Sequence, residues 1–174
     1  MVKKIIKYPA PSLRVFTKAV SFPITDEVRE HLRDLEDTLK ASADGLAIAS
    51  NQVLAEGHQV FIVRDVAELT EKFEGGLCFN PTWKPRGDDV ITDREGCLSF
   101  PGMSFMIPRF ESIIGEFQDI DGNKHSVIFD GLLARAFQHE YDHLTGVLFI
   151  DMLPKKAQTQ LYNTIVQRKK AGRW

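Results

Sequence analysis

The chain has 174 residues, of which 43% are hydrophobic, so it can bury the core of one globular domain without disulfide bonds. No apolar run approaches the ~18 residues of a membrane span, and no apolar stretch typical of a signal peptide is evident. The net charge of −2 conceals an asymmetry, because residues 155–174 carry six basic and no acidic side chains. The other residues therefore balance to −8.

The two cysteines lie nineteen positions apart and form no disulfide framework, which indicates a reducing compartment. We therefore expect a cytoplasmic protein, with an organellar mature form as the alternative. We also expect a single domain over residues 1–174, with no membrane or DNA partner.

Proline-rich residues 5–14 predict an extended arm rather than a helix. From Thr25, a plausible N-cap, the pattern becomes helical and ends at residues 43–45. His31 lies beside the apolar face and is expected to be partly packed rather than a ligand. The apolar positions of this helix repeat at helical spacing: Val28, Leu32, Leu35 and Leu39.

Short strands are expected in the middle of the chain. Residues 65–76 are interpreted as a polar loop or short helix, residues 83–87 as a turn, and Cys78 as a small core residue. Asp121-Gly122-Asn123 is a strong hairpin signal between two of the strands. The expected strands cover residues 58–63, 77–81, 90–92, 107–117 and 124–129.

The most informative stretch is His139-Glu140-Tyr141-Asp142-His143, which follows the pattern H-E-x-x-H after what look like the first turns of a helix. Helical positions i and i+4 share a face, so His139 and His143 can present two imidazoles to one metal ion. Glu140 would then lie beside the metal, placed to take a proton from a metal-bound water. Two ordinary helix histidines and a surface glutamate are the weaker interpretation.

A third ligand is needed. From Leu144 to the C-terminus there is no His, Glu or Cys, and the only carboxylate side chain is Asp151. Unless Asp151 serves, the ligand comes from upstream, where Cys97 is the best candidate. Two imidazoles and one thiolate would leave the fourth position open to water, as in a catalytic site. The sequence alone favours zinc, although Fe(II), Co(II) and Ni(II) fit as well.

The chain resembles peptide deformylases, whose second and third motifs, E-G-C-L-S and Q-H-E-x-D-H, stand unaltered at residues 95–99 and 138–143. Residues 45–52 resemble the first motif of that family, G-x-G-L-A-A-x-Q. Ala47 replaces the second glycine of this motif, so it would either carry backbone strain or narrow the cleft. We also expect Arg109 to pair with Glu95.

The resemblance implies a hydrolase that removes the formyl group from N-formylmethionine of nascent polypeptides and releases formate. It implies iron as the metal in cells, with zinc, nickel or cobalt as substitutes. It also implies that the side-chain amide of Gln52 and the backbone N–H of Leu98 stabilise charge on the attacked carbonyl oxygen, with Glu140 as general base and acid. The expected substrate-binding residues are Gly45, Leu46, Ala47, Leu132 and Ala136.

Two alternatives stay open, namely another H-E-x-x-H metallohydrolase such as a peptidase, and a non-catalytic relative that binds the ribosome. Leu161 and Ile165 recur at helical spacing, which predicts an amphipathic basic helix over residues 155–170. Its basic side is either solvated or contacts ribosomal RNA. We expect an α+β fold with mostly antiparallel short sheets around a central H-E-x-x-H helix, plus N-terminal and C-terminal helices.

Overall fold

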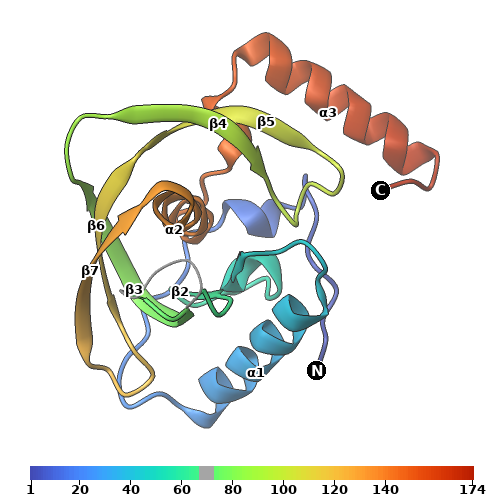
Figure 1. Ribbon diagram of the computed structural model, residues 1–174. Helices are drawn as coiled ribbons and strands as arrows, with labels where there is room; N and C mark the ends of the chain where they lie inside the picture. The colour runs from blue at the N-terminus through green and yellow to red at the C-terminus, as the bar shows by residue number, and fades with distance from the viewer. Residues whose placement is uncertain (67–72) are drawn as a thin grey trace.

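The computed structural model describes residues 1–66 and 73–174, and Figure 1 shows a helix enclosed by strands on several sides. A five-stranded antiparallel sheet has the order β1-β2-β3-β6-β7, and a separate two-stranded sheet pairs β4 with β5. The strands are β1 (Ala47–Ala49), β2 (Val60–Val63), β3 (Gly76–Pro85), β4 (Val90–Gly96), β5 (Ser104–Phe110), β6 (Ser112–Gln118) and β7 (Lys124–Asp130). The helices are α1 (Asp26–Ala41), α2 (Gly131–Leu144) and α3 (Lys155–Lys170), with short 3-10 turns at Pro11–Arg14, Ser50–Gln52 and Phe149–Met152. This is the expected α+β architecture with antiparallel sheets.

Helix α2 is the centre of the molecule. It packs against strands of both sheets, and the rings of Phe61 and Phe129 each lie 5.1 Å from the ring of Phe137 on this helix. The outer strands therefore bury most of α2, including the polar residues of its second half. Buried polar groups require specific hydrogen-bond partners. The polar residues in the second half of α2 are therefore the first place to look for a functional site.

Hydrogen bonds with single residues fix the start of helix α1 and the segment that follows it. Thr25 caps it by accepting a hydrogen bond from the Val28 amide at 3.3 Å, and the predicted apolar stripe is buried. Beyond the helix, the Arg64 guanidinium donates to the carbonyls of Leu39, Ser42 and Gly45. The sequence did not predict this clamp, which holds the segment leading into β1.

Several boundaries differ from the sequence predictions. The N-terminal arm contains a 3-10 turn at Pro11–Arg14, and residues 67–72 of the expected loop lie outside the described residues. The predicted turn at 83–87 is wrong for Trp83–Pro85, because β3 continues to Pro85 through an irregularity beside Asn80. The expected strand 107–117 divides at Glu111: Phe110 pairs with β4, whereas Ser112 pairs with β7. The predicted hairpin between β6 and β7 is confirmed.

Helix α3 has the predicted bounds and lies on the outside of the β4–β5 sheet (Figure 1). Leu161 and Ile165 are buried in a cluster that includes Phe100 and Phe149. Trp174 extends this packing, because its Nε1 donates to the Tyr8 carbonyl at 2.6 Å. Among the described residues, no helix is long and apolar enough to span a bilayer.

Candidate active site

Cys97, His139 and His143 meet at one point, although Cys97 follows β4 and the histidines belong to α2. Their ligand atoms all lie within 4.8 Å of one another, and Cys97 Sγ is 3.2 Å from His143 Nε2. Within the part of the chain that the structure describes, this is the one group of three or more such side chains able to hold a metal ion. Three sequence-predicted ligands are therefore brought together.

A buried carboxylate, that of Glu95, forms a hydrogen bond with one of the three residues of this group. Glu95 Oε1 lies 2.6 Å from His139 Nδ1, and Arg109 binds both oxygens of Glu95 at 2.8 and 3.1 Å, as predicted. Burial would raise the pKa of Glu95, but hydrogen bonds with His139 and Arg109 hold it well below its usual value. Arg135 also binds Glu95, at 3.0 Å, and was missed. Its position one helical turn before His139, on the same face of α2, was the available signal.

Asp151 does not serve as a ligand. Its carboxylate pairs with Arg14 and accepts a hydrogen bond from the Leu148 amide at 2.9 Å. Cys78 is equally remote from this role, because it is fully buried in the apolar core and burial raises its pKa well above the usual value. Cys97 is left as the third donor.

The electrostatics of the group suit a cation. Burial and the neighbouring His139 hold the pKa of His143 well below its usual value, which keeps this imidazole neutral as a ligand must be. Burial would also lower the pKa of His139, but interactions with Cys97 and Glu95 outweigh the effect of burial. The pKa of His139 is therefore raised well above its usual value. The surroundings of His139 therefore favour positive charge, and two nitrogens with one sulfur fit a zinc-like or ferrous ion.

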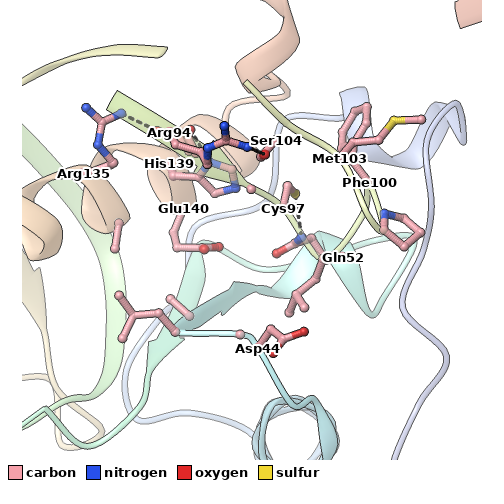
Figure 2. A pocket seen from close by; sticks show the side chains of 18 of the residues that line it. Asp44, Gln52, Arg94, Cys97, Phe100, Met103, Ser104, Arg135, His139 and Glu140 are labelled. Atoms are coloured by element: carbon pink, nitrogen blue, oxygen red, sulfur yellow. Dashed lines mark hydrogen bonds and ion pairs between the residues drawn. The ribbon is translucent and has the colours of Figure 1, made fainter. Parts of the chain in front are cut away.

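Two further predicted residues face this group. Figure 2 shows the Glu140 carboxylate and the Gln52 amide on the same side of His139 and Cys97. Glu140 is 4% exposed, its Oε2 has no hydrogen-bond partner among the described residues, and burial raises its pKa to about 7. Gln52 is fixed because its Oε1 accepts from the Ala49 amide at 2.9 Å, which leaves Nε2 3.1 Å from Ser99 Oγ.

A pocket of about 560 Å³ opens beside these side chains. Leu132 is 59% exposed, so it does not pack in the core. Ala47 lies in β1, and among the described non-glycine residues only Asn80 has a positive φ, so Ala47 carries no left-handed strain. Leu98 lines the pocket. So does every predicted substrate-binding residue, namely Gly45, Leu46, Ala47, Leu132 and Ala136.

Gly45 allows close packing of neighbouring side chains at this wall. A Cβ there would lie 2.8 Å from Ser42 Oγ and 2.9 Å from Leu98 Cδ1, closer than real contacts allow. Sequence reasoning missed several polar residues of the pocket, because only the β4–β5 pairing and the Arg64 clamp bring them to it. These residues are Asp44, Arg94 and Ser104.

Residues 2–159 match the family model described as polypeptide deformylase. A protein named peptide deformylase from Endomicrobium trichonymphae is 39% identical over 172 residues, which cover 98% of each chain. Another from Pseudomonas aeruginosa is 36% identical and covers 87% of each chain. Among solved structures, a peptide deformylase from Ehrlichia chaffeensis has a TM-score of 0.86 at 26% identity over 99% of each chain. One from Plasmodium falciparum has a TM-score of 0.79 at 30% identity, covering 96% of this chain and 98% of that one.

Proposed function

The chain belongs to the polypeptide deformylase family, and from this premise we propose that it hydrolyses the formyl amide of N-formylmethionine on nascent polypeptides. Formate and a free α-amine are the products. The main support is that the ligand atoms of Cys97, His139 and His143 lie within 4.8 Å of one another, beside a pocket that is also lined by Glu140. We place this activity in the cytoplasm.

Cys97 Sγ, His143 Nε2 and the remaining nitrogen of His139 would hold one divalent ion. Such an ion, when bound, supplies a Lewis acid that polarises the formyl carbonyl and acidifies water. We propose Fe(II) in cells, with zinc, nickel or cobalt as substitutes, because all accept two imidazoles and a thiolate. Glu95 orients His139 from the opposite side of the ring.

Glu140 is proposed to move the proton. Its carboxylate would take a proton from the attacking water and later deliver it to the leaving nitrogen of the substrate. A pKa of about 7 suits both steps, because the group is then nearly balanced between its two protonation states at neutral pH. Its Oε2 has no hydrogen-bond partner in the described part of the chain, which is consistent with a role toward substrate rather than toward the fold.

Gln52 and Leu98 are proposed to stabilise the carbonyl oxygen as it becomes negative. The Gln52 Nε2 group already points to the Cys97 side of the pocket, at 3.5 Å from Cys97 Sγ. The backbone N–H of Leu98 would be the second donor, from the residue that follows Cys97. Donors fixed before the reaction lose little energy in reorganisation, which is why such groups accelerate acyl transfer.

The apolar part of the pocket is proposed to hold the methionine side chain. Leu46, Ala47, Leu132 and Ala136 line it and present no charge. A flexible thioether chain can adapt to such a slot. Residues 155–174 are proposed to contact ribosomal RNA, since four lysines of α3 are exposed: Lys155, Lys156, Lys169 and Lys170.

Formate release tests the proposed function. The protein, purified without oxygen and with its metal content measured, should release formate from formyl-Met-Ala and leave unformylated Met-Ala-Ser intact. Cleavage of the unformylated peptide would indicate a peptidase instead. A metal-loaded protein that processes neither peptide would contradict an enzymatic role.

A further inference from the structure

The pocket contains one arginine that the chemistry above does not use. The Arg94 guanidinium donates to Ser104 Oγ at 3.0 Å and forms no ion pair with any residue the structure describes. Arg135, the other arginine of the pocket, is instead bound by Glu95 and by the carbonyls of Ile107 and Ile91. Arg94 is therefore the cation of this pocket that remains available to a ligand.

The β4–β5 pairing explains where this cation lies. Side chains alternate along a strand, so Glu95 points into the core while Arg94 and Gly96 share the other face. Gly96 is opposite Ser104 and has no side chain, which lets Arg94 lie across it toward Ser104. Figure 2 shows Arg94 and Ser104 beside His139 and Cys97, with Asp44 on the far side of the pocket.

The distance from the reacting group fits the start of a peptide. Arg94 precedes Cys97 by three residues, which corresponds to ~10 Å along an extended strand, and its side chain reaches to Ser104, which pairs with Gly96 next to Cys97. An extended substrate advances ~3.3–3.6 Å per residue. If the formyl carbon lies at the Cys97 group and the first side chain lies against Leu46 and Leu132, the second and third residues extend ~7–10 Å away.

Building on the proposed function, we propose that Arg94 makes the enzyme prefer formyl-peptides with an aspartate or glutamate at the second or third residue. A guanidinium lacking a carboxylate partner gains a charge-assisted hydrogen bond from such a substrate. A lysine or arginine at the same place would meet a like charge. The remainder of the pocket is consistent with this, because its exposed carboxylate, Asp44, lies on the opposite wall.

Four tetrapeptide amides test the preference: formyl-Met-Asp-Ala-Ser, formyl-Met-Ala-Asp-Ser and their lysine counterparts. Amidated ends are essential, because a free C-terminal carboxylate would itself bind Arg94. At low salt we expect kcat/KM to favour the acidic member of at least one pair by about two- to fivefold, the range of an exposed ion pair. The difference should lie in KM, since the contact is the same in ground and transition states. It should shrink as salt is added.

Variants assign the preference to this residue. Arg94→Gln should bring the ratio close to one, Arg94→Glu should invert it, and Arg94→Lys should retain its direction. Arg86→Gln is the matched control, because it removes the same charge from an exposed turn outside the pocket. Equal kcat/KM for acidic and basic peptides, or the same loss of preference in Arg86→Gln, would overturn the inference while formate release upholds the proposed function. Absence of formate from every peptide would overturn both.

Discussion

Glu95 Oε1 lies 2.6 Å from His139 Nδ1, and the same carboxylate is bound by Arg109 and Arg135. The hydrogen bond directs the other imidazole nitrogen toward Cys97 and His143. Glu95 is also two residues before Cys97, so the end of β4 and the residue that follows it supply both a proposed metal ligand and the group that orients another. Replacing this carboxylate should therefore affect metal binding and stability together.

Glu95→Gln should weaken metal binding about 10–100-fold, as expected when the orienting partner of a ligand is changed. It should also lower the free energy of unfolding by about 3–5 kcal/mol, because Arg135 would remain buried beside a neutral group and Arg109 would keep only its ion pair with Asp142. Chelator competition and urea denaturation measure the two effects. Glu116→Gln, an exposed change on β6, is the control. Unaltered metal affinity would show that Glu95 has no orienting role.

Cys97→Ala should remove one of three protein ligands and nearly abolish both metal retention and formate release. Two imidazoles alone hold a divalent ion poorly, and the thiolate supplies the charge that compensates the cation. Elemental analysis of the dialysed protein, alongside the formate assay, provides the measurement. Cys78→Ala is the matched cysteine control, because Cys78 lies in the apolar core. Full metal content in Cys97→Ala would refute the ligand assignment.

Glu140→Gln keeps the shape of the side chain and removes its ability to exchange a proton. Metal content should stay as in the wild type, since Glu140 is not among the converging ligands. The rate constant kcat should fall about 10²–10⁴-fold, the usual contribution of a general acid–base group. The measurement is the rate of formate release by wild-type and variant samples that have equal metal content. A variant as active as the wild type would exclude the proton-transfer role.

The sequence was most informative where function depends on local spacing. His139 and His143 are one turn apart on α2, and the cap at Thr25 is likewise a short-range pattern. Residues brought in by pairing between distant segments could not be located from spacing, and Gln52 and Arg109 were anticipated only through the resemblance to a known family. Arg64 reaches the end of α1 only after β2 pairs with β1, and the course of β3 past Asn80 depends on its pairing with β6. Such features follow from tertiary contacts rather than local propensity.

Ala47→Gly should enlarge the apolar part of the pocket that is proposed to hold the methionine side chain. Ala47 lines the pocket from β1 and is unstrained, so the effect of its methyl group is steric. We expect kcat/KM for formyl-Phe-Ala to rise several-fold relative to formyl-Met-Ala, within the range expected for one methyl group in a pocket. Stability should fall by about 0.5–1 kcal/mol because glycine is more flexible in the unfolded chain. An unchanged substrate ratio would mean that Ala47 does not limit the pocket.

Helix α3 combines a buried apolar stripe with exposed lysines. Leu161 and Ile165 belong to the same core cluster as Phe100, and Cys97 packs against that cluster. Deleting residues 155–174 would therefore damage the fold near the proposed metal ligands as well as remove charge. Neutralising exposed lysines on the helix separates the two contributions.

We predict that exchanging four exposed lysines of α3 for glutamine (Lys155, Lys156, Lys169 and Lys170) weakens co-sedimentation with ribosomes at low salt. Each lost phosphate contact should also reduce the salt dependence of binding by about one unit of slope. Formate release from formyl-Met-Ala should persist, because the buried stripe of α3 is retained. The control neutralises four exposed lysines elsewhere (Lys4, Lys40, Lys84 and Lys124). If both quadruple variants bind ribosomes like the wild type, these lysines of α3 are simply solvated.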